Sequence, residues 1–441
     1  MLSNWLIDTE LFAAPEDLSV FQKELPIDWI EQALKQTDKA SIRRRKLPAE
    51  LVVWLIVGIG LYRNRSISEV VAKLDLKLVN KLGETVAPSA IPQARQRLTD
   101  TPLQALFDIS ANHWLEREDK EDTWHGLQLY SIDGTQLRCA DSPETAEEFG
   151  YLTNNPPKHT EYPVIRMCAL MSLRSRMIKD VKFGSSGIGE INYAKQLVNS
   201  ATENSLTILD RCYLSAELMI NWQRAKPNQN WMTPIKRNTK YRVIEQYAEN
   251  DFLVEMNVSG HARKQDPSLP EVWQARLVTY KDQKQKNHIS GLLSSLHNPQ
   301  QYPADDILDV YFERWEIENG YGEIKQYQLD ESILLRSQTV QGIKQEIWGL
   351  LIAYNLIRVE ISQIAKEAKV SPLRISFVMA MRYIQDELMW CAIASPGTIP
   401  KKLRAMRDNV KQFILPEKRK RPKSRTVRFS KTQYAIRSKH A

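Results

Sequence analysis

The stretch YFERWEIENGYGEIKQYQLD, residues 311–330, is predicted to form a helix, because apolar residues recur with helical spacing and no proline interrupts it. At about 100° per residue, four of its side chains project within an arc of about 60°. These four are Tyr311, Arg314, Glu318 and Lys325. The other acids, Glu313, Glu316 and Glu323, point elsewhere by the same geometry. One carboxylate inside a stripe of two cations and a phenol suits a metal ion held next to a phosphate. The alternative is the solvated face of an ordinary amphipathic helix.

The composition is that of a folded protein with an uneven charge. The chain has 441 residues, 42% of them hydrophobic and 8% aromatic, which is enough for two to four domains. Its formal charge is +8, but residues 416–441 alone hold ten Lys or Arg and one Glu, which leaves about −1 for residues 1–415. A basic tail of this kind suits contacts with a phosphate backbone. It equally suits a solubilising role.

Cysteine usage and hydropathy indicate the compartment. The four cysteines form no CxxC pair and the seven histidines show no zinc-type spacing, so we expect a reducing compartment and no structural zinc site. The longest apolar run, LVVWLIVGIGLY at 51–62, is shorter than the about 20 residues that span a bilayer, and is expected to be a buried helix. The N-terminus shows no secretory signal pattern. We therefore expect a cytoplasmic protein without a membrane partner, which in a bacterium would associate with the nucleoid when it acts.

The pattern along the chain predicts five regions. Residues 1–120 are expected to be helical, and RSISEVVAKL followed by a turn-rich piece and AIPQARQRL has the outline of a helix-turn-helix. The second helix of that outline would present four side chains that can contact bases or phosphates. These are Gln93, Arg95, Gln96 and Arg97. On this pattern Arg95 and Arg97 are candidate DNA contacts. The alternative is that all four are ordinary surface residues.

The remaining regions alternate between strands and helices. Residues 121–227 mix predicted strands and helices, and residues 228–300 read as a β-rich segment with polar turns. Helices return in 301–367, and 368–441 is expected to be helical before the basic tail. The fold class is therefore α/β.

Three acids stand out by position. Asp133, in YSIDGT, and Asp210, in TILDRCY, are each expected at a strand end, and Glu318 is on the predicted helix. Three converging carboxylates can hold two Mg²⁺ ions for an in-line phosphoryl transfer. Aspartate also ends strands merely as a turn residue, and spacing alone leaves that alternative open.

These motifs together resemble the DDE transposases of bacterial insertion sequences, specifically the insertion sequence 4 family. The family signature Tyr-x₂-Arg-x₃-Glu-x₆-Lys is met without departure in residues 311–325, and YSIDGT and TILDRCY supply the two aspartate motifs. The resemblance extends over PETAEEFG, KLPAELVVWLIVGIGLYR, IPQARQRL and EIWGLLIAYNLIR, so it covers most of residues 40–365.

The resemblance implies an RNase H-like catalytic core, a mixed sheet flanked by helices, that a β-rich insertion interrupts before the glutamate. It implies an enzyme that cleaves double-stranded DNA at the terminal inverted repeats of a transposon and transfers the strands into target DNA. By the same resemblance, a homodimer would act in the synaptic complex. An inactive DNA-binding relative and an RNase H-like nuclease without strand transfer are the alternatives.

The resemblance also assigns roles to residues. Asp133, Asp210 and Glu318 would be the ligands of two Mg²⁺ ions, for which Mn²⁺ can substitute. The stripe residues Tyr311, Arg314 and Lys325 would bind phosphates of the terminal nucleotides. Relatives that form hairpins stack a tryptophan of the insertion on a flipped base, and Trp231 and Trp273 lie in the corresponding segment. Both are predicted to be packing residues of the β-rich segment instead.

Overall fold

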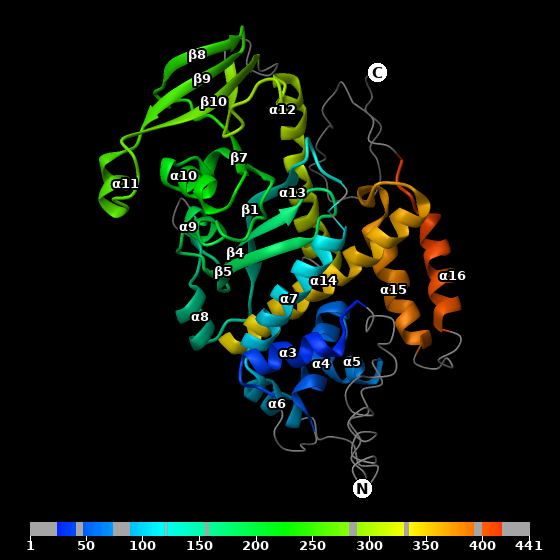
Figure 1. Ribbon diagram of the computed structural model, residues 1–441. Helices are drawn as coiled ribbons and strands as arrows, with labels where there is room; N and C mark the ends of the chain where they lie inside the picture. Colours follow the sequence, from blue (N-terminus) through cyan, green and yellow to red (C-terminus); the bar gives the residue numbers. More distant parts are fainter. Residues whose placement is uncertain are drawn as a thin grey trace, which may run out of the picture.

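A nine-stranded mixed sheet organises the molecule (Figure 1). The computed structural model describes residues 24–40, 47–73, 89–118, 120, 122–154, 158–281, 289–329, 335–391 and 399–416. Five strands form the first part of the sheet, and they are β1 (Gln128–Arg138), β4 (Val164–Ser172), β5 (Ile178–Ser185), β6 (Ser205–Leu209) and β7 (Gln229–Pro234). Their order is β5-β4-β1-β6-β7. Strand β4 runs antiparallel to its neighbours β5 and β1, whereas β6 is parallel to both β1 and β7. This is the RNase H-like core that the resemblance implied.

The β-rich segment extends this sheet rather than forming a separate one. It contains β8 (Arg242–Ala248), β9 (Asp251–Asn257), α11 (Gly260–Gln265), β10 (Val272–Lys281) and β11 (Ile289–Ser294). Strand β11 pairs antiparallel with β7, and the order continues β11-β10-β9-β8 to the edge of the sheet. Strand β7, which was predicted as part of the β-rich segment, also pairs in parallel with β6 of the core.

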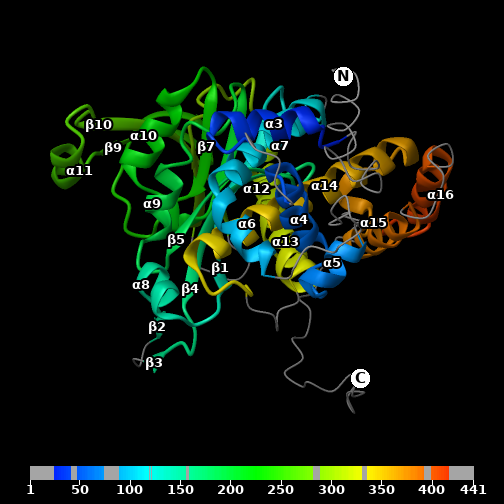
Figure 2. The same ribbon diagram turned by 90° about the horizontal axis from the view of Figure 1, so that it is seen from below.

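Helices cover both faces of the core sheet, as the view in Figure 2 shows. One face carries α9 (Glu190–Lys195) and α10 (Ala216–Ala225), whose apolar residues pack with Tyr130 and Ile132 of β1. The other face carries α7 (Thr101–Glu118), α13 (Trp315–Gly322) and α14 (Val340–Ala368). The smaller elements of the chain are α8 (Pro143–Phe149), β2 (Thr153–Asn154), β3 (Lys158–His159), and the 3₁₀ turns Arg211–Tyr213 and Pro372–Arg374.

The N-terminal helices share one hydrophobic core with α13 and α14. They are α3 (Ile27–Gln36), α4 (Ala49–Leu61), α5 (Ile67–Lys73) and α6 (Ala90–Leu98), followed by α7. Helix α4, from the long apolar run, has buried residues on every side and lies against α14, which confirms the prediction of a buried helix. Backbone meets backbone there, because a Cβ built on Gly60 would lie 2.4 Å from the carbonyl oxygen of Gly349. The turn-rich connection of the expected helix-turn-helix, 74–88, lies outside the described residues.

The stretch that follows the β-rich segment is helical but not uniform. It consists of α12 (Ala304–Tyr311), a 3₁₀ turn (Phe312–Arg314), α13, and a π-helical turn (Glu323–Gln328). The prediction of helix over 311–325 is confirmed, but the ideal repeat of 100° per residue is not, since both irregular turns change the rotation along the chain.

The C-terminal region is helical. The chain ends, as described, with α15 (Phe377–Cys391) and α16 (Ile399–Lys411), which pack on α14 and on each other. Most of the basic tail, residues 417–441, lies outside the described residues. A search of the described helices finds none with the length and apolar character needed to cross a bilayer.

Candidate active site

Asp133 and Asp210 lie side by side where β1 and β6 stop pairing. The last parallel pair is Ile132 with Leu209, so each aspartate is the next residue on its strand. Neighbouring strands lie about 4.8 Å apart, which brings the two carboxylates to one edge of the pairing. Asp210 ends its strand, as predicted. Asp133 does not, because β1 continues to Arg138 along β4, where Asp133 pairs with Ala169.

Glu318 approaches from the helix above these strands. Its helix, α13, is fixed to β1 by the Tyr321 hydroxyl, which donates a hydrogen bond of 2.6 Å to the carbonyl oxygen of Asp133. The same hydroxyl accepts a hydrogen bond of 3.2 Å from the backbone N–H of Ala169. Tyr321 is buried and follows Glu318 by almost one turn. Its two bonds therefore fix the helix that carries Glu318 against the strand that carries Asp133.

Arg314 lies among the three acids. Its Nη2 is 3.1 Å from Glu318 Oε1, one helical turn further on, and the charges of Asp133 and Asp210 both act to raise the pKa of Arg314. The residue is only 8% exposed. Its guanidinium also lies over the ring of Trp315, with 5.4 Å between Cζ and the ring centroid. Arg314 is therefore the stripe residue that interacts with all three acids.

The environment of Asp133 is unfavourable to its charge. Burial raises its pKa to about 6, while a hydrogen bond from the Gly134 N–H and the charge of Arg314 act in the opposite direction. The neighbouring carboxylates of Glu190 and Glu318 act in the same direction as burial and contribute to this raised pKa. Near this pKa a proton and a divalent cation compete for the same carboxylate.

Sequence reasoning missed Glu190, the fourth acid of this region. It is the first residue of α9 and its side chain covers Gly134, where a Cβ would lie 2.5 Å from Glu190 Cδ. The glycine of YSIDGT is thereby explained, because any side chain there would displace the carboxyl group. An acid at a helix start is common, so the sequence carried no specific signal for it.

The remaining stripe residues occupy the irregular ends of the helix. Tyr311 is partly buried at the end of α12, and burial raises its pKa, with Asp210 and Arg314 among the charges that act on it. Lys325 is partly buried in the π-helical turn, and no described residue forms an ion pair with it. Both lie seven residues from Glu318 on the same run of helices.

The two other acids on the inner side of this helix are structural. Glu316 and Glu323 both accept hydrogen bonds from Arg176, in the turn between β4 and β5. Glu323 also pairs with Arg358 and accepts a hydrogen bond of 3.0 Å from the hydroxyl of Tyr354, both on α14. This buried network ties the helix to β4–β5 and α14, so its acids are not available to a ligand.

The two candidate DNA contacts on α6, Arg95 and Arg97, have different surroundings in the structure. Arg95 donates to Gln345 at 3.1 Å, and also to Ser337 and to the carbonyl oxygen of Gly342. Its guanidinium therefore fastens α6 to α14, and the prediction of a DNA contact for Arg95 does not fit its position. Arg97 is exposed.

The two tryptophans of the expected insertion pack in the core, as predicted. Trp231 on β7 is completely buried and Trp273 on β10 is 9% exposed. Their ring centroids are 5.6 Å apart, within the hydrophobic cluster that α9 and α10 also line. Neither ring is placed to stack on a base.

The side-chain types of Asp133, Asp210 and Glu318 suit a divalent cation, although the described residues do not form a complete metal site. Carboxylates are the ligands that Mg²⁺ and Mn²⁺ prefer. Within the described ranges, no three acid, histidine or cysteine side chains lie close enough together to hold an ion. One of the three acids, Glu318, is instead paired with the guanidinium of Arg314.

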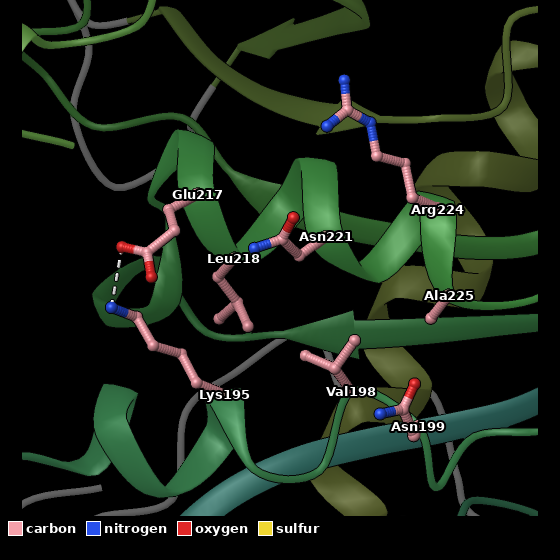
Figure 3. Close-up of a pocket in the computed structure, with 8 residues that line it drawn as sticks. All are labelled: Lys195, Val198, Asn199, Glu217, Leu218, Asn221, Arg224 and Ala225. Carbon is pink, nitrogen blue, oxygen red and sulfur yellow. Dashed lines mark hydrogen bonds and ion pairs between the residues drawn. The ribbon is translucent and has the colours of Figure 1, made fainter. Parts of the chain in front are cut away.

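A separate cavity of about 350 Å³ lies between α9 and α10 (Figure 3). Its wall includes Asn221 and Arg224, and an ion pair of 2.7 Å between Lys195 and Glu217 closes one side. None of the three acids lines it. The cavity is therefore not part of the cluster around Asp133.

Comparison with known proteins gives the family. The family model for the insertion element 4 transposase N-terminal region matches residues 15–108, and the model for the transposase DDE domain matches residues 124–356. Transposase InsG for insertion sequence element IS4, from Escherichia coli (strain K12), is 34% identical over 408 residues, 92% of this chain and 90% of the relative. The putative transposase InsZ of the same organism is 32% identical over 232 residues, 52% of this chain and 76% of that protein.

Among solved structures, the cryo-EM structure of a piggyBac transposase synaptic complex with hairpin DNA aligns with a TM-score of 0.40 and 13% identity, covering 93% of this chain and 85% of that one. The RNase H-like core and the matched DDE domain define the class, a DDE transposase, which is an enzyme that acts on DNA and depends on divalent metal. Within that class, the chain belongs to the insertion sequence 4 family.

Proposed function

We propose that Asp133, Asp210 and Glu318 are the ligands of two Mg²⁺ ions in this transposase, and that the site cleaves transposon ends and transfers them into target DNA. The observation that supports the proposal is that the three acids lie on elements that contact one another: parallel pairing puts the two aspartates at adjacent strand positions, and Tyr321 fixes the Glu318 helix to the backbone of Asp133. Bound ions would activate the attacking oxygen and stabilise the leaving one.

The chain's own residues would position the DNA. Arg314 presents a planar guanidinium suited to a phosphate, and Tyr311 and Lys325 flank it along the same run of helices. The orientation of Glu318 depends on the helix that carries it, which the buried partners of Glu316 and Glu323 keep fixed. These residues would hold the terminal phosphates while the acids stay in place.

Further contacts would bind DNA away from the chemistry. Exposed Arg97 on α6 can contact the terminal inverted repeat, and the basic tail can add affinity that does not depend on sequence. Because two transposon ends are cut together, we propose that a homodimer acts in the synaptic complex. Bacterial DNA is carried in the nucleoid, so we place the action of the enzyme there.

A substitution at Glu318 tests the ligand assignment. Glu318→Gln keeps the shape of the side chain but removes its charge, so it should abolish cleavage of DNA that carries the element's ends while binding of those ends survives. Glu313→Gln, on the same run of helices but paired with Arg174, is the matched control and should cleave like the wild type. Wild-type cleavage by Glu318→Gln in Mg²⁺ would show the assignment to be wrong.

Strand transfer into a target plasmid separates the proposed transposase from a plain nuclease. The wild-type protein should give joined products as well as hydrolysis products. Hydrolysis alone with purified protein and precleaved ends would contradict the proposed strand transfer.

A further inference from the structure

The Arg314–Glu318 ion pair places a cation beside a carboxylate that would also bind a metal ion. Nη2 of Arg314 lies 3.1 Å from Glu318 Oε1, and the arginine side chain is 10% exposed. Oε2 of Glu318 stays open among the described residues, but a guanidinium and a divalent cation repel each other, and each is stabilised by the same carboxylate charge. The observed pair and the metal therefore compete for Glu318, given the proposed role of that residue.

The charges around the pair explain why a cation belongs there. Asp133 and Asp210 act on Arg314 from the strands and Glu318 acts from the helix. Glu190 adds a further carboxylate beside Asp133. Like charges in a partly buried site repel one another strongly, so a cation among them stabilises the arrangement.

The same guanidinium still has donors for a phosphate. Nε of Arg314 is buried and has no hydrogen-bond partner among the described residues, while Nη2 is bound to Glu318. A guanidinium has five N–H donors in a rigid fork and binds phosphate more favourably than a compact ammonium does. A phosphate at this position would satisfy the unpartnered donor and draw the side chain away from Glu318.

We propose that Arg314 is an internal counterion of the acidic cluster, which competes with the metal for Glu318 until a phosphate of the DNA end takes its place. Metal and DNA end then bind cooperatively, since each favours the arrangement in which Arg314 and Glu318 are apart. The enzyme would acquire its full affinity for metal only on its own DNA. This inference rests on the proposed roles of the three acids and deepens them.

Metal affinity of the full-length protein tests the proposal without any turnover. Mn²⁺ binding is measured by the electron paramagnetic resonance of free Mn²⁺, first without DNA. Arg314→Gln should bind Mn²⁺ at least about 5-fold more tightly than the wild type, the lower range of typical coupling between two sites. Arg174→Gln is the charge-matched control, because Arg174 pairs with Glu313 and Asp122 instead, and its Mn²⁺ affinity should equal that of the wild type.

A second measurement adds a duplex with a precleaved end and a 3′-dideoxy terminus, which cannot react. DNA can itself supply a metal ligand, so the informative quantity is the factor by which DNA tightens Mn²⁺ binding. This factor should be at least about 5-fold larger in the wild type than in Arg314→Gln. Arg314→Lys keeps a cation and should bind Mn²⁺ without DNA as the wild type does. Arg314→Met repeats the test should the glutamine variant fail to fold.

The outcomes separate the two proposals. An Arg314→Gln protein that binds Mn²⁺ no more tightly than the wild type, with equal tightening by DNA in both, overturns the counterion role while the acids remain ligands. Absence of Mn²⁺ binding in all variants, with and without DNA, instead overturns the proposed metal site.

Discussion

Asp133→Asn should stabilise the protein while it abolishes cleavage. The pKa of Asp133 rises from its ordinary 3.8 to about 6 in the folded chain, so the fold holds this carboxylate at a cost. One unit of pKa corresponds to about 1.4 kcal/mol, so the shift amounts to about 3 kcal/mol at pH 7.5. Asparagine has no charge to bury, and its Oδ1 can still accept the hydrogen bond from the Gly134 N–H. We therefore expect Asp133→Asn to raise the free energy of unfolding by up to about 3 kcal/mol.

The gain should depend on pH with a defined sign. A carboxyl whose folded pKa is raised contributes stability at low pH and loses it as the pH rises through the folded value. The advantage of asparagine should therefore be largest at pH 7.5, about half as large at pH 5, and absent below the ordinary pKa of 3.8.

Urea denaturation in EDTA at pH 7.5 and pH 5 measures the effect. Glu203→Gln, at an exposed acid before β6, is the control and should change stability by less than about 0.5 kcal/mol at either pH. A gain for Asp133→Asn that is equal at both pH values, or a loss at pH 7.5, would refute the electrostatic origin.

Three further predictions concern DNA binding and packing. Lys325→Ala should weaken binding of the element's end and reduce the slope of log affinity against log salt by about 1, measured by mobility shift at several salt concentrations; an unchanged slope would argue against a phosphate contact. Arg97→Ala should lower DNA affinity without changing thermal stability, whereas Arg95→Ala should cost about 1–3 kcal/mol of unfolding free energy because it leaves three partners on and beside α14 without their donor. The opposite pattern would reverse our assignment of the two arginines. Gly60→Ala should lower the free energy of unfolding by about 1–3 kcal/mol, because its Cβ would meet the carbonyl of Gly349. In a free helix this change normally stabilises by about 1 kcal/mol, so a measured gain of that size would contradict the close contact.

The sequence was most informative where function depends on local spacing. Arg314 and Glu318 are one helical turn apart, so their contact follows from the sequence. Asp210 closes a short apolar strand, and its position follows from the pattern as well. Helical character over 311–325 was predictable, but the 3₁₀ and π-helical turns were not, since they depend on what the helix packs against.

Features that depend on residues distant in the chain could not be predicted from the sequence. Strand β7 was assigned to the β-rich segment because its own residues cannot show that β6 is its neighbour. Arg95 looked like a DNA contact because α6 alone does not reveal that α14 covers it. Glu190 lies 57 positions from Asp133 in the chain and meets it only through the folded sheet.

The contact of α4 with α14 also affects how the chain folds during translation. Helix α4 is apolar on every side, and its principal partner begins about 280 residues later. At about 5–20 residues per second, the ribosome needs roughly 15–60 s to deliver that partner. During this interval only its early neighbours α3, α5 and α6 can cover part of the apolar surface of the newly made helix. Chaperone supply and translation rate should therefore govern how much active enzyme a cell obtains from each messenger, independently of how strongly the gene is transcribed.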